Sequence, residues 1–495
     1  MSLHLRARLS SLRPVEWDGG WLLSGAVFVL ALALRLVNIR FPDKIIFDET
    51  YYAKDAWSML HHGYEVNAEG NGPAFVVHPP LGKWMIALGE WWYGNTSTGW
   101  RFSAAIVGAL SVLILTRLVR RMTGSTLLGC IAGMLLSLDG LHYVLSRAAL
   151  LDIFLMFWIL VSLACLVIDR DQGRARLLKA IETGVNTAYP GPSLGIRWWR
   201  IAAALAIGCA LATKWSALYY FVAFVLLTAA WDVGARRSAG ITHPVRAALL
   251  RDWAWLVPTF AIVPTLTYLA SWTGWFLSND AWDRHWNNHS GIIGSLRGLW
   301  HYHYEMWHFH STLHTPHSYA SKPFTWLVIG RPVSFSVDYP KTGEHLYGQT
   351  CHVAGSCYSE VLAVGTPAIW WAGIAAMLVT AYLWISKRDW RAAVALVGFA
   401  AGFLPWLPFT NRTMFYFYAL PLLPFEILAI TLTIGLILGR ESDSENRRLA
   451  GVVAVSAYVM LVLVNFAWLH PILSGDLISP NAWRARVSDW FPGWV

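Results

Sequence analysis

Residues 21–55 read "WLLSGAVFVLALALRLVNIRFPDKIIFDETYYAKD" and combine two features that decide the kind of fold. The segment 21–39 is a nearly uncharged apolar run, of the length that a helix needs to cross a bilayer, about 20 residues. An adjacent acidic pair, Asp48 and Glu49, follows shortly after it, between aromatic residues. The stretch predicts a spanning helix with charged groups at the membrane surface. An isolated acidic pair of this kind is also typical of a solvated loop end.

The composition supports a membrane protein over the whole chain. Of 495 residues, 56% are hydrophobic and only 14% are charged, whereas soluble proteins average about 25% charged residues. Many of the 30 tryptophans lie near the ends of apolar runs, where interfacial belts form. The net charge of +9 is spread in short clusters between these runs. We therefore predict an all-α polytopic membrane protein with no nucleic-acid partner.

Eleven segments have the apolar character of membrane-spanning helices. They cover 21–39, 100–119, 124–142, 149–168, 199–213, 215–232, 253–272, 363–385, 390–408, 414–438 and 450–469. With eleven spans, the basic connectors all fall on one side, which the positive-inside rule makes cytoplasmic. Without the short fifth span, the later basic connectors would lie on the wrong side. We expect residues 1–20 inside the cell and the tail 470–495 outside.

This topology divides the chain into a membrane core and two long outer loops. We expect a core over 21–272 that includes the first outer loop, 40–99, then a second outer loop, 273–362, and a four-span region, 363–469. Neither loop has the Gly/Ser runs or blocks of like charge that mark a flexible linker. The polar chemistry is thus predicted on the outer face of one membrane domain.

Two cysteines, Cys351 and Cys357, lie outside the predicted spans, in "CHVAGSC" of the second outer loop. An oxidising compartment permits a disulfide at this position. Their short spacing favours a bridge, and two free thiols are the alternative.

The first outer loop holds the leading candidates for catalysis. A general base must lie within hydrogen-bond reach of the proton that it removes, and partial desolvation raises the pKa of a carboxylate. Because adjacent side chains point in different directions, Asp48 and Glu49 can have different tasks. In "HPPLGK" (78–83), two prolines restrict the backbone, so His78 is presented from a rigid segment. Lys83 begins an amphipathic stretch suited to the membrane interface.

Four charged residues lie at or near the outer ends of predicted spans. Arg101 opens the second span, where it needs a partner such as Glu49 or must reach the headgroups. Arg147 and Asp152 lie at the outer turn between the third and fourth spans, where Asp152 is also a reasonable N-cap. Lys214 lies in another outer turn, at a depth where an ammonium is a natural partner for a lipid phosphate.

The remaining candidates lie in "HYHYEMWHFHSTLHTPHSYASKPFTW" (301–326) and in the last outer turn. The histidines suggest a metal site, because imidazole is the commonest metal ligand. They occur as i, i+2 pairs, however, and we find no helical i, i+4 pairing with a carboxylate and no HExxH motif. A catalytic metal is therefore an alternative that we do not predict. His317 lies in a loop shaped by proline, and Asn411 and Arg412 share an outer turn where Arg412 is a second phosphate candidate.

In this order, the segments resemble the protein O-mannosyltransferase family, membrane glycosyltransferases of the GT-C class. The matches are "FDE" (47–49), "HPPLGK", an arginine heading the next span, "LLDIFL" (150–155), "TKWSALY" (213–219), "TPHSYASKPFTW" (315–326), "VGTPAIWW" (364–371) and "NRTMFYFYALP" (411–421). Each motif is weak alone, but together they are collinear over most of 20–440. The family's eleven spans agree with the number obtained from charge.

The resemblance implies transfer of mannose, with inversion, from a polyprenyl-phosphate carrier to Ser or Thr of secreted or translocating proteins. Asp48 then corresponds to the base, Glu49 to the partner of Arg101, and Lys214 to the cation at the lipid phosphate. The family's His-x-Tyr motif corresponds to His317 and Tyr319. We assign Lys214, Arg412, Arg101, Arg147 and Asn411 to the donor phosphate, and His78, Lys83, Asp152, His317 and Tyr319 to substrate binding or support of the site.

Two departures from the eukaryotic pattern point to a bacterial, actinobacterial-type member in the plasma membrane. The second outer loop has about ninety residues, too few for the β-trefoil-repeat domain of eukaryotic members. Phe417 stands where those members usually have a histidine between two tyrosines. The implied partners are the lipid-linked donor, secreted polypeptides and membrane lipids, with the Sec translocon as a candidate. No cofactor is expected.

Three other functions are consistent with a polytopic chain, among them a non-catalytic lipid-binding or assembly factor, which would tolerate loss of Asp48. Another GT-C transferase would use a polyprenyl-phosphate sugar on a glycan or lipid acceptor. A secondary transporter is disfavoured, because the ionisable residues cluster at the ends of spans rather than near the midplane.

Overall fold

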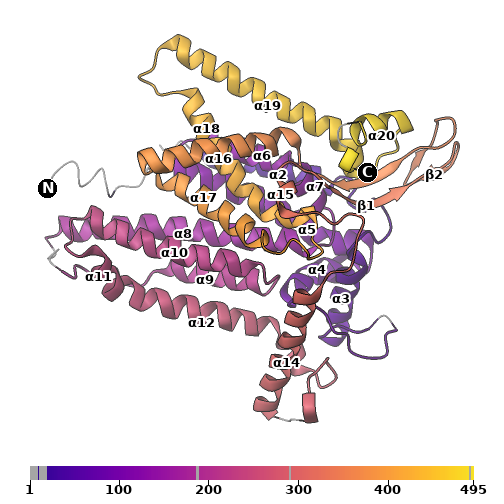
Figure 1. Ribbon diagram of the computed structural model, residues 1–495, viewed down its shortest axis with the longest axis horizontal. Coiled ribbons are helices and arrows are strands. Elements are labelled where there is room, and N and C mark those ends of the chain that lie inside the picture. The colour runs from indigo at the N-terminus through magenta and orange to yellow at the C-terminus, as the bar shows by residue number, and fades with distance from the viewer. Residues whose placement is uncertain are drawn as a thin grey trace.

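The computed structural model describes residues 9, 19–67, 69–184, 189–288, 291–489 and 492–494. Most of the predicted cytoplasmic N-terminus, 1–20, lies outside this range. The described chain is dominated by long helices that run roughly parallel to the longest axis of the molecule (Figure 1).

Seven helical segments are long and apolar enough to cross a membrane. They are α5 (Ser97–Thr123), α8 (Leu151–Glu182), α10 (Ala217–Ser238), the combined segment Pro244–Ser271 that ends in α12 (Ala254–Ser271), α16 (Pro367–Lys387), the segment Tyr416–Leu438 that ends in α18 (Leu423–Leu438), and α19 (Glu445–Ser474). Four shorter apolar helices lie beside them: α2 (Gly19–Leu36), α6 (Thr126–Ser137), α9 (Trp198–Leu211) and α17 (Trp390–Phe403). Each of the eleven predicted spans overlaps one of these segments, and the number of actual crossings stays a prediction.

The third and tenth predicted spans differ from single continuous helices. In the third, α6 ends at Ser137, and a separate short helix, α7 (Gly140–Leu145), begins after Asp139. The carboxylate of Asp139 accepts the backbone N–H of His142 as an N-cap, at 2.9 Å. Since this cap requires an extended Asp139, it ends the regular run. The tenth span begins as a 3₁₀ segment, η4 (Tyr416–Leu422), before α18.

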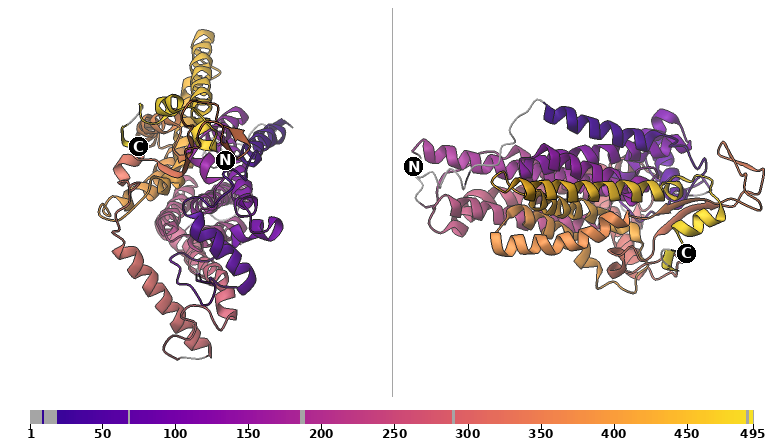
Figure 2. Two further views of the ribbon diagram at one scale, coloured as in Figure 1. Left: turned by 90° about the vertical axis from the view of Figure 1, so that its right-hand side faces the viewer. Right: turned by 90° about the horizontal axis from the view of Figure 1, so that it is seen from above.

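The two long connectors lie at the same end of the bundle, which we call the loop end (Figure 1). The first connector forms α3 (Glu49–His62) and α4 (Leu81–Tyr93). The second forms α13 (Thr273–Leu277), α14 (Gly291–Thr312), α15 (Pro323–Trp326), the antiparallel pair β1 (Val333–Asp338) and β4 (Ser359–Ala363), and the small hairpin β2 (His345–Leu346) and β3 (Gln349–Thr350). In the end-on view, α14 and α19 extend to opposite sides of the bundle (Figure 2).

Cys351 and Cys357 form a disulfide beside the β2–β3 hairpin, with their Cα atoms 5.7 Å apart. Within the described residues, the remaining cysteines, Cys130, Cys165 and Cys209, are free. The bridge closes a short segment of the second connector, so it constrains a region that contains few helices.

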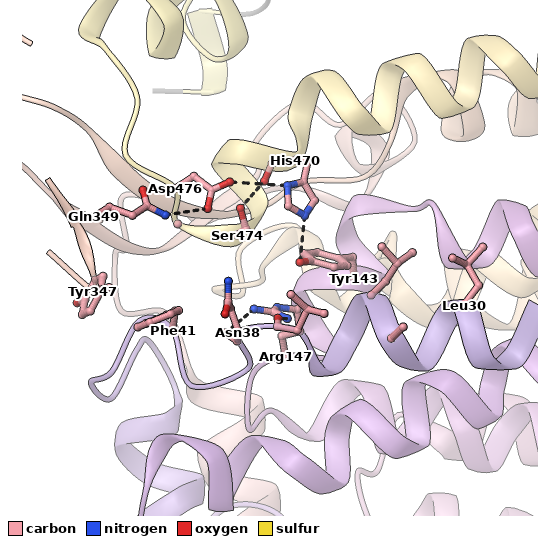
Figure 3. Close-up of a pocket in the computed structure, with 14 residues that line it drawn as sticks. Leu30, Asn38, Phe41, Tyr143, Arg147, Tyr347, Gln349, His470, Ser474 and Asp476 are labelled. Carbon is pink, nitrogen blue, oxygen red and sulfur yellow. Dashed lines mark hydrogen bonds and ion pairs between the residues drawn. The ribbon is translucent and has the colours of Figure 1, made fainter. Parts of the chain in front are cut away.

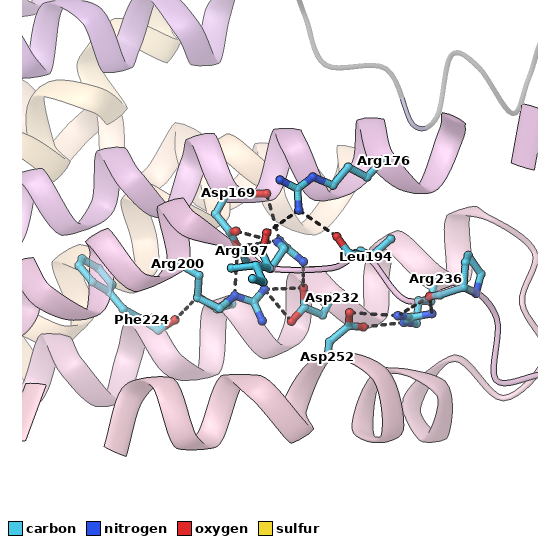
Figure 4. A network of polar contacts seen from close by, with 12 residues as sticks. Asp169, Arg176, Leu194, Arg197, Arg200, Phe224, Asp232, Arg236 and Asp252 are labelled. Carbon is cyan, nitrogen blue, oxygen red and sulfur yellow. Dashed lines mark hydrogen bonds and ion pairs between the residues drawn. The ribbon is translucent and has the colours of Figure 1, made fainter. Parts of the chain in front are cut away.

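The opposite end of the bundle is held by a network of arginines and aspartates (Figure 4). Asp169 on α8 accepts hydrogen bonds from Arg197 at 2.6 and 2.7 Å and from Arg200 at 3.1 Å. Arg200 also donates to both carboxylate oxygens of Asp232 on α10, at 2.8 and 2.9 Å. The network therefore joins α8, α9 and α10. It also pairs each of its buried charges with an opposite one, and a buried charge without a partner would be costly. We call this the arginine–aspartate network.

Candidate functional site

Asp48 precedes the first turn of α3 at the loop end and is half-buried. Its side chain does not cap the helix, and within the described residues its carboxylate has no hydrogen-bond partner. Burial raises the pKa of Asp48 to about 6, against the opposing effect of the Lys214 ammonium, and nearby Asp152 raises it further. An unpartnered carboxylate with this pKa is available to accept a proton near neutral pH.

The neighbouring Glu49 is fully buried and has no such freedom. Its two oxygens accept hydrogen bonds from Arg101 Nε at 2.7 Å and from the second Arg101 amino group at 2.8 Å. The backbone N–H groups of Ile46 and Ala149 also donate to Glu49, each at 3.0 Å. Arg101 in turn donates to loop carbonyls, including that of Pro42 at 2.8 Å. The predicted Glu49–Arg101 pair thus fixes the loop that presents Asp48.

Lys214 is buried and donates to both carboxylate oxygens of Asp152, at 2.9 and 3.0 Å. Its Nζ also lies 4.2 Å from the centre of the Tyr418 ring, within cation–π range. Asp152 comes from the first turn of α8, and Lys214 from the turn between α9 and α10. The pair therefore joins two predicted outer turns and places a cation beside Asp48.

The "HPPLGK" segment packs directly against these turns. The backbone N–H of Leu81 donates to the Ala212 carbonyl at 3.0 Å. A Cβ on Gly82 would lie only 2.7 Å from the Leu151 side chain, so glycine permits this close approach of α4 to α8. Lys83 forms a buried ion pair with Glu65 and donates to the His78 carbonyl at 3.2 Å. Lys83 therefore supports the loop rather than contacting substrate.

A groove with a cavity volume of about 930 Å³ opens beside Lys214. One part is apolar and is lined by residues of α10, α12 and α14, including Phe221, Phe260 and Trp307. The other part is polar and contains Lys214, Arg412, Asn411, His78 and His310. A cavity with an apolar part and a cationic part matches the chemistry of a long hydrocarbon chain joined to a phosphate.

The polar part of the groove contains neutral imidazoles as well as cations. Burial, Lys214 and His310 lower the pKa of His78 well below its usual value. Burial also lowers the pKa of His310 to about 4, and Arg412 adds to this effect. Arg412 donates a hydrogen bond to His310 Nδ1 at 3.3 Å, and His310 Nε2 lies 2.7 Å from the Val77 carbonyl oxygen. Near neutral pH, Lys214 and Arg412 therefore supply the positive charge.

His317 lies on the Asp48 side of the site. Its ring is 6.3 Å from Phe47 and 5.0 Å from Phe415 in edge-on contacts. Its Nδ1 accepts the backbone N–H of Tyr319 at 3.1 Å, and the Tyr319 ring lies 5.7 Å from the Arg331 guanidinium. Both predicted residues are thus near the residue that precedes Asp48, and neither lines the groove.

Two of the residues assigned to the donor phosphate, Arg101 and Arg147, do not line the groove. Arg101 is fully buried, and its guanidinium is occupied by Glu49 and by backbone carbonyls. Arg147 donates to the carbonyls of Arg35, Val37 and Asn38 at 2.6–2.9 Å and lines a separate pocket of about 210 Å³ with Tyr143 and His470 (Figure 3). Both arginines hold backbone near the first span, because these carbonyls lack helical partners there.

Three contributors were missed from the sequence. Tyr418 lies under the Lys214 ammonium, His310 contacts Arg412, and Trp215 stacks against His303 at 5.7 Å. All three residues fall inside quoted motifs, but no spacing rule separates them from neighbouring aromatic residues. A metal-type i, i+4 pairing was also missed, since His301 and Glu305 share α14 with Asp283 nearby.

Comparisons with known proteins show which family the chain belongs to. A family model described as dolichyl-phosphate-mannose-protein mannosyltransferase matches residues 25–273, and one described as the C-terminal four TMM region of protein-O-mannosyltransferase matches 295–494. The chain is 40% identical to the polyprenol-phosphate-mannose–protein mannosyltransferase of Mycolicibacterium smegmatis, over 97% of this chain and 94% of that protein. The chain belongs to the protein O-mannosyltransferase family. Its Mycobacterium tuberculosis relative of the same name is 38% identical, over 97% of this chain and 93% of that protein.

A solved structure shows the same fold in a distant member of the protein O-mannosyltransferase family. The Saccharomyces cerevisiae Pmt1–Pmt2 complex bound to the sugar donor superposes with a TM-score of 0.76 at 15% identity, covering all of this chain and 94% of that one. The protein O-mannosyltransferase described here is therefore a membrane-embedded mannosyltransferase with the GT-C architecture that the motifs implied.

Proposed function

We propose that the protein transfers mannose from polyprenyl-phosphate-mannose to Ser or Thr hydroxyls of secreted proteins, with inversion, at the outer face of the plasma membrane. The observation that carries this proposal is the Asp48 carboxylate, which has no hydrogen-bond partner within the described residues and is close enough to Lys214 for that ammonium to lower its pKa, while Lys214 itself lines the polar part of the groove. The names of the mycobacterial relatives support the donor and the protein acceptor.

In the proposed reaction, Asp48 removes the proton of the acceptor hydroxyl as its oxygen attacks C1 of mannose. A bond forms between that oxygen and C1, and the bond from C1 to the phosphate oxygen breaks. The electron pair leaves with the polyprenyl phosphate. Because a single displacement occurs at C1, the anomeric configuration inverts. One carboxylate suffices, since no second nucleophile is needed.

The leaving phosphate is stabilised by Lys214 and Arg412, which line the same part of the groove. Asp152 holds the Lys214 ammonium in place through two hydrogen bonds, and one N–H of the ammonium remains for the phosphate. A preorganised cation at the place where negative charge develops lowers the barrier more than a mobile one. A phosphate anion leaves without a general acid, so these cations meet the requirement of the step.

The distribution of charge supports the proposed outer location of the site. The loop end carries Asp48 and the groove, while the basic C-terminal turns of α5 and α10 contain Arg120, Arg121, Arg236 and Arg237. Both turns lie beside the arginine–aspartate network, because Arg121 donates to Asp171 on α8 at 2.8 Å and Asp232 of the network is on α10, one turn before Arg236 (Figure 4). The positive-inside rule then favours a cytoplasmic network and an extracytoplasmic groove.

The proposal is tested with the purified full-length protein in lipid nanodiscs. Polyprenyl-phosphate-mannose is supplied with a Thr-containing peptide, with the same peptide carrying Val in place of Thr, or with a glycolipid acceptor. We expect mannosylated Thr peptide, detected by mass spectrometry, with an anomeric configuration opposite to that of the donor by NMR. Transfer to the glycolipid alone would assign the chain to another acceptor class, and retained configuration would contradict the single displacement.

A further inference from the structure

A cluster of three potential metal ligands lies on α14 and the loop before it, outside the groove. Asp283, His301 and Glu305 each offer one ligand atom, and these three atoms lie within 4.8 Å of one another. His301 and Glu305 are four residues apart on α14, so their side chains share one face of the helix. Asp283 approaches that face from the loop after α13.

The charges of this cluster are unbalanced without a cation. Its two carboxylates lie close together. Within the described residues, Asp283 contacts His301 at 2.7 Å, which is an ion pair only when that imidazole is protonated, and Glu305 has no ion pair. The adjacent Arg284 is directed elsewhere, to the Phe276 carbonyl at 2.9 Å. Two carboxylates at this separation repel each other unless a positive charge lies between them.

The surroundings hold each ligand in a defined orientation. Trp282 Nε1 donates to Glu305 at 3.1 Å, and the Trp286 ring stacks on the His301 ring with centroids 4.3 Å apart. His301 Nδ1 lies 2.7 Å from Asp283. Such supporting contacts are typical of metal ligands, whose outer partners fix ring and carboxylate orientation.

We propose that Asp283, His301 and Glu305 bind one divalent transition-metal ion of the Zn²⁺ class. A tetrahedral Zn²⁺ places its ligand atoms about 3.4 Å apart, so on binding the wider separations, up to 4.8 Å, shorten and the 2.7 Å contact between His301 Nδ1 and Asp283 opens. One imidazole and two carboxylates suit Zn²⁺ best and Mn²⁺ next, while Mg²⁺ and Ca²⁺ prefer oxygen ligands alone.

The ion has a structural task, because none of its three ligands lines the groove. His301 and the groove residue His310 are nine residues apart on α14, which corresponds to roughly 13 Å along the helix. α14 packs on the loop end through Tyr302 and Met306, which are buried with Trp272 and Trp275. An ion between Asp283 and α14 therefore clamps the helix that forms one wall of the groove.

Metal binding is measured on the full-length protein after removal of metals with a chelator. Zn²⁺, Mn²⁺, Mg²⁺ and Ca²⁺ are titrated separately, bound metal is quantified by mass spectrometry, and thermal unfolding is followed by tryptophan fluorescence. We expect one Zn²⁺ per chain, weaker binding of Mn²⁺, and a higher Tm with Zn²⁺. No bound Zn²⁺, or tighter binding of Mg²⁺ or Ca²⁺ than of Zn²⁺, would overturn the proposal.

Three variants and a control separate this site from incidental histidine binding. Asp283→Asn and His301→Ala should weaken Zn²⁺ binding more than about 100-fold, and Trp282→Phe, which keeps all three ligands, about 10-fold. His308→Ala removes an exposed histidine of the same helix and should change nothing. Equal Zn²⁺ binding by the wild type, Asp283→Asn and Trp282→Phe would show that the ion binds elsewhere. These readouts do not depend on mannose transfer.

Discussion

The two ends of the bundle both contain buried charge, but they pair it differently. In the arginine–aspartate network, Asp169 and Asp232 face Arg197 and Arg200, so two carboxylates meet two guanidinium groups. At the loop end, Asp48 and Asp152 share one ammonium, and Lys214 gives its two hydrogen bonds to Asp152. The network is balanced, whereas around the Lys214 ammonium there is one carboxylate in excess.

The difference separates stability from reactivity. A balanced, hydrogen-bonded pair keeps buried charges satisfied and holds helices together, and its groups have no capacity for further bonds. An excess carboxylate is costly to bury, but it retains the free oxygens that a general base needs. The adjacent residues Asp48 and Glu49 show the same contrast. Both carboxylate oxygens of Glu49 accept hydrogen bonds, whereas within the described residues the Asp48 carboxylate accepts none.

The largest expected effect is loss of the excess carboxylate. Asp48→Asn keeps the shape of the side chain but cannot accept the hydroxyl proton, so transfer to peptide should fall about 10²- to 10⁴-fold. Initial rates with saturating donor measure this loss. The size-exclusion elution profile of the purified variant shows whether it folds normally. The control is Asp55→Asn, a half-buried carboxylate further along α3, which should keep most of the activity. Near-wild-type transfer by Asp48→Asn would remove Asp48 as the base.

Breaking the arginine–aspartate network should lower stability and leave activity unchanged, the reverse of the effect expected for Asp48→Asn. Arg200→Met leaves two buried carboxylates with fewer partners, which destabilises the folded state by roughly 3–5 kcal/mol. Thermal unfolding in detergent should show a lower Tm, while kcat per folded molecule stays unchanged. Arg237→Met, at an exposed position on α10, is the matched control with no expected change in Tm. A fall in kcat with an unchanged Tm would contradict the assignment of stability to the arginine–aspartate network and of reactivity to the loop end.

Removing the cation of the site should affect donor use more than chemistry at the acceptor. Lys214→Ala deletes a charge-assisted contact to the phosphate, which is worth about 1.5–3 kcal/mol, or about 10- to 100-fold in donor kcat/KM. Kinetics at varied polyprenyl-phosphate-mannose should show a raised donor KM and little change in peptide KM. Lys54→Ala, at an exposed position on α3, serves as the control. A change confined to the peptide KM would place Lys214 on the acceptor side.

Much of the fold was predictable, because lipid imposes strong rules on sequence. Long apolar runs and basic connectors located the helices, with errors where a polar residue such as Asp139 starts a new helix inside an apolar stretch. The Glu49–Arg101 pair was also predictable, since a buried arginine requires a partner. The backbone contacts of Arg101 and Arg147 were not predictable, because sequence does not show which carbonyls a guanidinium will bind. Tyr418 and Asp283 were missed for the same reason, as their contacts join distant segments.

The smallest expected effect concerns the electrostatic coupling within the site. Asp48 must be deprotonated to act as a base, and its pKa of about 6 means that kcat/KM falls as pH drops through about 6. Asp152 raises the Asp48 pKa, so Asp152→Asn removes a negative charge and stabilises the Asp48 carboxylate. The acid limb of the kcat/KM–pH profile should therefore move to lower pH, while the amide oxygen still accepts a hydrogen bond from Lys214. A limb that moves to higher pH, or stays in place, would mean that a group other than Asp48 sets the profile.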